Sequence, residues 1–107
     1  MQELTVGQAS AHTGWSPRML RYLEAAGLVV PRRSPAGYRL YGLLELNQLR
    51  SLQALRRRYD VELSDVAFAA RLDREPDLRA AVVTWLAGAQ LHALDWEQRK
   101  HERLLVA

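Results

Sequence analysis

The sequence contains no cysteine, a single lysine and one phenylalanine, and it has no run of apolar residues long enough to cross a membrane. Without cysteine, the chain forms no disulfide, holds no thiolate metal site and carries no thiol redox sensor. The missing apolar run excludes a membrane span, and the amino-terminal residues lack the basic-then-apolar layout of a secretory signal. We therefore expect a cytoplasmic protein whose fold is held by packing alone.

Residue patterns typical of a catalytic centre are also missing. His12, His92 and His101 are far apart in the chain, and none has the spacing of a metal-ligand pair. Glu97 and His101 lie one helical turn apart, which is typical of an ordinary surface pair. We predict that the chain is not an enzyme and that it binds no metal and no cofactor.

Positive charge is concentrated in the front half of the chain. The 107 residues, 49% of them hydrophobic, suffice for one compact domain with an extended arm. Nine arginines stand against four acidic residues in Met1–Asp60, whereas six basic residues stand against eight acidic ones in Val61–Ala107. This polarity is typical of a phosphate-binding head on a neutral-to-acidic tail. A solvated, arginine-rich surface is the alternative.

The segment Ser16–Tyr41 predicts a short helix followed by a basic hairpin. Ser16 suits the N-cap, Pro17 the first helical position and Gly27 a left-handed stop. Helical periodicity predicts an inward face made of Met19, Leu20, Leu23 and Ala26. The outward face is made of Arg18, Arg21, Tyr22 and Ala25. A helix that is seated in the core and shows arginines and a tyrosine outward has what a DNA-recognition helix needs.

A second helix is expected just before this one, at about Val6–Thr13. Thr5 and Gln8 have the spacing of a capping box, and Gly14 follows the last helical residue. Only three residues, from Gly14 to Ser16, then link the two helices. Such a tight, glycine-containing corner matches helix-turn-helix geometry, although many small helical domains have one.

After Gly27 the segment LVVPRR is expected to be a strand, SPAG a type I turn and YRLY the returning strand. Alternation places Leu40 toward the body of the protein and Arg39 away from it. Together with Arg32 and Arg33, Arg39 gives the hairpin three guanidinium groups near its tip. A hairpin of this kind beside a recognition helix is a wing that grips the DNA backbone; an ordinary charged hairpin is the alternative.

Two further helices are expected at about Leu43–Arg57, capped by Gly42, and at about Leu63–Leu72. Their predicted buried residues are Leu46, Leu49, Leu52 and Leu55 in the first, and Leu63, Val66, Phe68 or Ala69, and Ala70 in the second. The cluster Arg56–Arg58 is expected to break the first of these helices. It is either a second phosphate clamp or a solvated helix end that the helix dipole favours.

A last helix is expected from Asp77 to about Leu105, opened by Pro76. It carries the spacing of a coiled-coil seam: Leu78, Val82, Trp85, Ala89, His92 and Trp96. A small head cannot cover two tryptophans on so long a helix, so we expect an antiparallel partner helix from a second copy and a twofold homodimer. The alternatives are a helix folded back on its own domain and a small ligand held at the seam.

The phrases LTVGQASAHTGWSPRMLRYLEAAGLVVPRR and GYRLYG, followed by the leucine-rich third helix, resemble the MerR family of bacterial transcription regulators over about Leu4–Leu72. The resemblance implies a mostly α fold, with a winged helix-turn-helix head that carries a small β-hairpin wing in residues 1–74. It implies a long C-terminal helix in residues 75–107 that forms an antiparallel coiled-coil dimer. The expected function is that of a nucleoid-associated, sequence-specific regulator, a homodimer that reads a palindromic operator in double-stranded DNA, with RNA polymerase at the promoter as a further partner.

By this resemblance the recognition helix, the wing and a second wing all contact DNA. The predicted DNA-binding residues are Ser16, Pro17, Arg18, Arg21 and Tyr22, then Arg32, Arg33, Tyr38 and Arg39, and finally Arg57 and Arg58. The chain departs from the family pattern at Leu23, where a second tyrosine is common, and at YDV, where a glycine is usual. It has neither a ligand-binding domain nor metal-binding cysteines, so no small-molecule effector is expected. The functional alternatives are a DNA-architectural, excisionase-like winged protein and an interaction adaptor that acts through its last helix.

Overall fold

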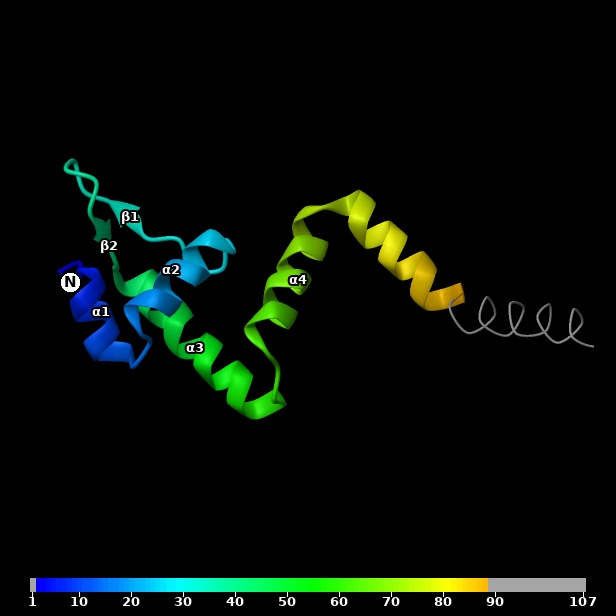
Figure 1. Cartoon of the computed structure of the whole chain (residues 1–107), viewed down its shortest axis with the longest axis horizontal. Helices are drawn as coiled ribbons and strands as arrows, with labels where there is room; N and C mark the ends of the chain where they lie inside the picture. The colour runs from blue at the N-terminus through cyan, green and yellow to red at the C-terminus, as the bar shows by residue number, and fades with distance from the viewer. Residues whose placement is uncertain (1, 89–107) are drawn as a thin grey trace, which may run out of the picture. The chain divides into compact units, whose positions relative to one another are not determined.

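The computed structural model describes residues 2–88, which form helices and one small hairpin (Figure 1). In chain order the elements are α1 (Val6–Thr13), α2 (Pro17–Ala25), β1 (Arg32–Arg33), β2 (Arg39–Leu40), α3 (Leu43–Tyr59) and α4 (Leu63–Arg74). Residues 76–88 are also helical. The chain divides after Ala70 into two compact units. The predicted fold class, mostly α with a β-hairpin, is confirmed.

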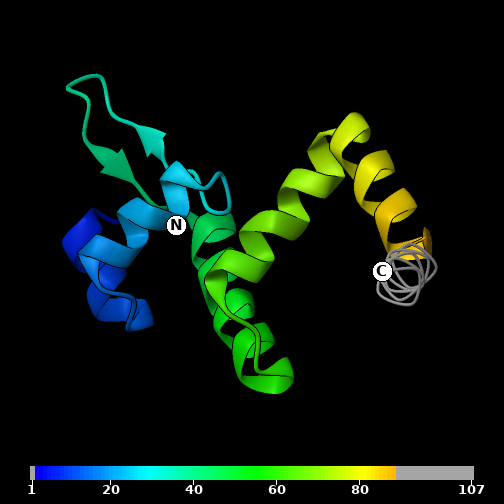
Figure 2. The same cartoon turned by 45° about the vertical axis from the view of Figure 1, so that its right-hand side comes forward.

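The first three helices pack together, and the hairpin projects from them in both views (Figures 1 and 2). Their shared core is almost entirely aliphatic, and its fully buried side chains are Ala9, Leu20, Leu23, Tyr41, Leu46 and Leu49. Leu20 and Leu23 occupy the predicted inward face of α2. Because each fully buried leucine contributes about 1.5–3 kcal/mol relative to exposure, this face fixes how α2 is seated.

The ends of α1 and α2 follow the predicted local signals. Thr5 Oγ1 accepts a hydrogen bond from the Gln8 amide at 3.3 Å, while Gln8 Oε1 accepts one from the Thr5 amide at 2.9 Å. This reciprocal pair is the expected capping box. At the start of α2, Ser16 Oγ accepts a hydrogen bond from the Met19 amide at 3.1 Å, and Pro17 takes the first helical position.

Helix α2 ends in a Schellman motif at Gly27. The Leu28 amide donates to the Leu23 carbonyl at 2.9 Å, and the Gly27 amide donates to the Glu24 carbonyl at 2.9 Å. Gly27 has a φ of +72°, a conformation that costs glycine little because it lacks a Cβ. The predicted left-handed stop at Gly27 is confirmed.

The hairpin turns at the predicted SPAG segment. Arg32 pairs with Leu40 and Arg33 with Arg39 in an antiparallel ladder. The Gly37 amide closes the turn on the Ser34 carbonyl at 2.9 Å, and Gly37 has a φ of +90°. At the root of the hairpin, Leu4 and Tyr41 exchange backbone hydrogen bonds of 2.8 and 2.7 Å. The residues that precede α1 therefore anchor the returning strand.

Two packing expectations, one for α3 and one for α4, are wrong. Leu55 is 39% exposed, because the buried ridge of α3 ends at Leu52 and Leu55 lines an open apolar hollow with Leu28 and Val66. Phe68 and Ala69 are exposed as well, since the side of α4 that faces the core is set by Leu63 and Val66. Two residues beyond Val66 the helix has turned by about 200°, so Phe68 points away from the core.

Helix α3 does not break at the arginine cluster. It continues through Arg56, Arg57 and Arg58 to Tyr59, and Asp60 follows with a φ of +52°. Aspartate tolerates this left-handed conformation better than most residues, so Asp60 ends the helix where glycine is common. Three cations in the last turn also interact favourably with the carboxyl end of the helix dipole.

Within the helical residues 76–88, Leu78 and Val82 are partly buried and Trp85 is 67% exposed. The other predicted seam residues, Ala89, His92 and Trp96, lie outside the described residues. In the part of the chain that the structure describes, no helix has the length and hydropathy needed to span a membrane.

Candidate nucleic-acid interface

The outward face of α2 carries a group of polar side chains held on a rigid support. Arg18, Arg21 and Tyr22 are all exposed, as predicted, because Leu20 and Leu23 occupy the opposite side of the helix in the core. Within residues 2–88, neither Arg18 nor Arg21 forms a salt bridge. Both guanidinium groups therefore keep their full hydrogen-bonding capacity for an external acceptor.

The corner before α2 is fixed from behind by α3. The Trp15 indole is buried and donates from Nε1 to the Leu49 carbonyl at 3.0 Å. Gln53 donates from Nε2 to the Thr13 carbonyl at 3.1 Å, so the end of α1 is tied to the same helix. These two bonds set where α2 begins, and Ser16 and Pro17 lie exposed at that amino end.

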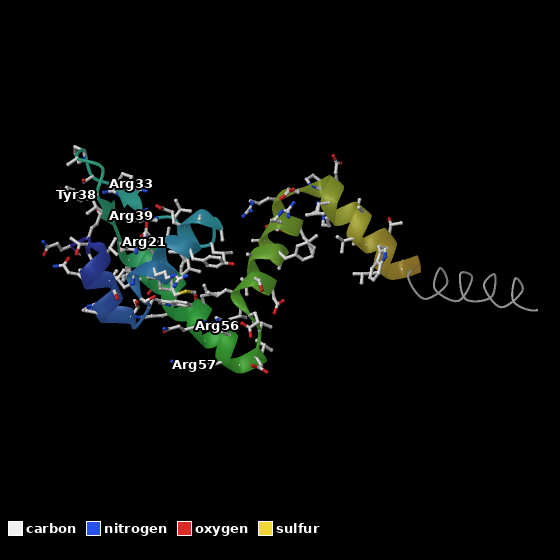
Figure 3. The ribbon with its side chains drawn as sticks, in the orientation of Figure 1. Arg21, Arg33, Tyr38, Arg39, Arg56 and Arg57 are labelled. Atoms are coloured by element: carbon white, nitrogen blue, oxygen red, sulfur yellow. The ribbon has the colours of Figure 1, made fainter. Side chains whose placement is uncertain are left out.

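The hairpin presents one free aromatic side chain, whereas its arginines are already engaged. Tyr38, next to the turn, is 72% exposed. Arg33 and Arg39 both pair with Glu24 of α2, at 3.1 and 2.9 Å respectively, and Figure 3 shows the two guanidinium-bearing residues on the same hairpin. Arg32 pairs through two nitrogens with the Glu3 carboxylate.

Arg39 was expected to point away from the body of the protein, but only 26% of its side chain is exposed. The side chain bends onto Glu24, and its Nε also donates to Glu24 Oε1, at 3.0 Å. Strand alternation alone misplaced Arg39 because the attraction to a carboxylate on a neighbouring helix decided its conformation. Leu40, expected to face the body, is partly buried.

Tyr41 is buried close enough to these ion pairs for their charges to act on its hydroxyl. Its side chain is fully buried, and the hydroxyl has no hydrogen-bond partner within the described residues. Burial and, to a smaller extent, the negative charge of Glu24 raise the pKa of Tyr41, while Arg39 and Arg33 oppose that shift. Tyr41 therefore stays neutral, and the charge balance at the hairpin depends on Glu24 and its two arginines.

In the arginine cluster at the end of α3, Arg56 packs against Trp15, while Arg57 and Arg58 are exposed. The Arg56 guanidinium lies over the Trp15 ring, 5.7 Å from its centroid, and the Arg56 Nε is buried without a hydrogen-bond partner in residues 2–88. Arg57 and Arg58 are exposed, and Arg58 lies over the Tyr59 ring at 5.3 Å. Figure 3 shows Arg56 and Arg57 near the carboxyl end of α3, away from the labelled hairpin residues.

Arg56 also lines an open hollow of about 480 Å³ between α2 and the start of α4. The other residues that line it are Arg18, Met19, Tyr22, Glu62, Leu63 and Ser64. Arg56 thus lies beside the outward face of α2. The sequence placed it in the cluster Arg56–Arg58, interpreted as either a second phosphate clamp or a solvated helix end, but only Arg57 and Arg58 were listed as DNA-binding residues. The sequence does not show that Arg56 lies over Trp15, which is 41 residues earlier in the chain and is brought close only by folding.

Comparison with known proteins gives a consistent set of matches. The model of the MerR family regulatory protein matches residues 5–41. An uncharacterized HTH-type transcriptional regulator of Pseudomonas aeruginosa is 33% identical over 104 residues, covering 94% of this chain and 74% of that protein. The HTH-type transcriptional regulator HmrR of Rhizobium leguminosarum bv. viciae is 38% identical over 53 residues, covering 50% of this chain. This chain spans 41% of HmrR and 23% of two mycobacterial regulators.

Solved structures share the fold at low sequence identity. HiNmlR, a MerR family regulator lacking the sensor domain and bound to promoter DNA, has a TM-score of 0.58 at 21% identity, with coverage of 96% of this chain and 84% of that one. The HTH-type transcriptional regulator SkgA from Caulobacter crescentus has a TM-score of 0.54 at 24% identity, with coverage of 100% and 99%. At these identities the match is one of fold.

Proposed function

Because this chain belongs to the MerR family of regulatory proteins, we propose that it binds double-stranded DNA in a sequence-specific manner and regulates transcription. The observation that carries the proposal is the outward face of α2. It presents Arg18, Arg21 and Tyr22 from a helix whose opposite side is seated in the core by two buried leucines, and neither arginine has a salt-bridge partner in residues 2–88. The promoter DNA bound to HiNmlR, which has the same fold, supports this choice of ligand.

Base reading is assigned to the arginines of α2. An α-helix fits the major groove of B-DNA, and a guanidinium matches the O6 and N7 acceptors of guanine in a bidentate manner. Arg18 and Arg21 are exposed and stand on a helix that Trp15 holds in place, so the backbone that carries the donors is positioned before the DNA arrives. Ser16 and Pro17 at the amino end of α2 would approach the DNA backbone at the groove edge.

Backbone contacts are assigned to the wing and to the end of α3. Tyr38 offers an exposed hydroxyl at the hairpin, and Arg57 and Arg58 are exposed cations. We add Arg56, because its guanidinium is held against Trp15 and lines the same hollow as Arg18. Phosphate contacts of this kind supply affinity that falls as salt rises, and they fix the register in which α2 meets the bases.

A homodimer would place two such heads on one operator. The helical residues 76–88 expose Val83, Trp85 and Leu86 by 59–67%. Of these three residues, Trp85 belongs to the predicted seam, where burial against a partner would remove its apolar surface from water. We propose that residues 75–107 pair with those of a second copy through Leu78, Val82 and Trp85, and also through Ala89, His92 and Trp96, which lie outside the described residues. A twofold dimer would read a palindromic site and act on RNA polymerase at a promoter.

Selection of bound duplexes from a random library by the full-length chain, followed by footprinting of the enriched sequence, tests the proposal. We expect an enriched site with two half-sites in inverted orientation. The matched control is the Arg18→Ala/Arg21→Ala double variant, which should enrich no sequence. Absence of enrichment by the unaltered chain would refute sequence-specific binding. Head-to-tail half-sites, by contrast, would indicate a DNA-architectural protein.

A further inference from the structure

Glu24 occupies an unusual position, because one carboxylate on the recognition helix holds two arginines of the hairpin. Its Oε1 accepts hydrogen bonds from Arg33 Nη2 at 3.1 Å and from Arg39 Nε at 3.0 Å, and Arg39 Nη2 lies 2.9 Å away. Its Oε2 accepts from Arg33 Nη2 at 3.3 Å. Glu24 therefore links β1, β2 and α2 at a single point.

These ion pairs are more shielded from solvent than the others in residues 2–88. The Glu24 side chain is 18% exposed, and its partners Arg39 and Arg33 are 26% and 49% exposed. Arg32, in its pair with Glu3, is 69% exposed. The pair between Arg71 and Glu75 spans four residues of one chain segment and holds no separate element. Exposed pairs contribute little because solvent screens them, while a partly buried carboxylate with several charge-assisted bonds is a stronger restraint.

The hairpin needs such a restraint. Each strand has two residues, and a two-stranded hairpin of this size is at best marginally stable by itself. Its root is held by the Leu4–Tyr41 backbone bonds and by the exposed pair between Arg32 and Glu3. Without an attachment to α2 as well, the tip with Tyr38 could swing about that root. The attachment comes from α2, two residues beyond Tyr22.

We propose that Glu24 is a positioning residue for DNA recognition, which fixes the wing against the recognition helix and withholds Arg33 and Arg39 from indiscriminate phosphate binding. The inference rests on the proposed function. Arg33 and Arg39 then serve as supports of the wing, while Tyr38 and the free arginines of α2 make the contacts. The carboxylate leaves the group of Glu24, Arg33 and Arg39 with a net charge of +1, where the two arginines alone would carry +2.

The substitution Glu24→Gln, made in the full-length chain, separates positioning from charge. Two probes are used, the duplex enriched by selection and a 30-base-pair duplex of random sequence. The freed guanidinium groups should raise affinity for the random duplex several-fold and steepen the salt dependence by about one counterion. The loosened wing should lower affinity for the selected duplex, so that the ratio of specific to non-specific affinity falls by about tenfold or more.

Glu3→Gln is the matched control. Glu3 precedes α1 and pairs with Arg32 of the same hairpin, so the change removes the same charge beside the wing without touching α2. Both affinities should then rise together, and their ratio should stay unchanged. If Glu24→Gln also leaves the ratio unchanged, or weakens both affinities in parallel, Glu24 does not set specificity and the inference is overturned.

A measurement without DNA keeps this inference distinct from the proposed function. In the free protein, the amide of Ser34, which donates to the Tyr38 carbonyl, and the amide of Gly37, which donates to Ser34, report on the hairpin. Hydrogen exchange at these amides should become several-fold faster in Glu24→Gln, while the amide of Leu49 in the core keeps its rate. Unchanged hairpin exchange would overturn the positioning role. A chain that selects no DNA but shows the faster exchange would refute the proposed function and, with it, the role in specificity, leaving Glu24 as a support of the hairpin.

Discussion

The Trp15 indole donates a buried hydrogen bond to the Leu49 carbonyl, and this bond joins the turn between the first two helices to the middle of α3. The same ring lies beneath the Arg56 guanidinium. Trp15 therefore connects the start of the recognition helix to the core. It also supports Arg56, the residue proposed to contact a DNA phosphate. A single side chain in a three-residue corner thus sets the placement of both.

Trp15→Phe should lower the free energy of unfolding by about 1–3 kcal/mol, since it removes one buried hydrogen bond and leaves unfilled volume. Urea unfolding followed by circular dichroism measures the loss, with the m-value unchanged. The exposed aromatic residue Tyr38 provides the control, because Tyr38→Phe should change stability by less than about 0.5 kcal/mol. Equal losses in the two variants would contradict the role assigned to Trp15.

Arg21→Ala should weaken binding to the selected duplex by about 1–3 kcal/mol and relax the preference at one base pair. The reason is that Arg21 is exposed on α2 and has no salt-bridge partner in residues 2–88. Fluorescence anisotropy with single-base variants of the duplex measures both effects. Arg50→Ala removes the same charge from an exposed position on α3 and should leave base preference intact. If Arg21→Ala weakened binding equally for every sequence, Arg21 would be a backbone contact instead.

Arg56→Met should separate stability from DNA binding. The change removes a buried Nε that has no partner in the described residues, and it also removes the stacking on Trp15. These effects oppose each other, so stability should stay within about 1 kcal/mol of the unaltered chain. Affinity should fall uniformly across sequences, and the salt slope should decrease by about one. Arg58→Met is the comparison at the exposed end of the cluster, and unaltered affinity in Arg56→Met would remove Arg56 from the interface.

Tyr41 should make the protein sensitive to alkaline pH. Its pKa in the folded state lies above the ordinary value near 10, chiefly because of burial. Above about pH 10 the unfolded chain releases this proton while the folded chain retains it, so stability should decline there as pH rises. Tyr41→Phe should flatten this decline without a large loss at neutral pH, because the hydroxyl has no partner in residues 2–88. Thermal unfolding at pH 7 and from about pH 9.5 to 11 checks it. An identical alkaline decline in both proteins would contradict the assignment.

Trp85→Gln should weaken self-association. Trp85 is 67% exposed and stands in the predicted seam, where glutamine would introduce a polar side chain into an apolar contact. Light scattering coupled to size exclusion should give the mass of two chains for the unaltered protein and a shift toward one chain for the variant on dilution. Asn47→Ala, an exposed change on α3, is the control. A single-chain mass for the unaltered protein at high concentration would contradict the proposed homodimer.

Local signals in the sequence predicted the local features of the fold. Ser16 and Gly27 act within a few residues of themselves, so the cap and the stop of α2 follow from short-range geometry. The SPAG turn is predictable for the same reason. The outward face of α2 follows from periodicity once Leu20 and Leu23 are placed in the core.

Features that depend on distant parts of the chain were not predictable in this way. The pairing of Arg39 with Glu24 requires the hairpin to fold back along α2, and strand alternation contains no such information. The exposure of Leu55 depends on where the packing against α3 ends, which periodicity along α3 cannot show. The cluster Arg56–Arg58 was a candidate phosphate clamp from the sequence, but the stacking of Arg56 on Trp15 became evident only in the fold.

The backbone bonds between Leu4 and Tyr41 have a practical consequence for anyone who shortens this protein. Helical content would suggest starting an excised head at Val6, where α1 begins. Such a fragment would lose both the bridge at Leu4 and the Glu3 partner of Arg32. Of the attachments described above, the wing would then keep only its ion pairs with Glu24 of α2. The short segment before α1, residues 2–5, thus decides whether a minimal head keeps its shape.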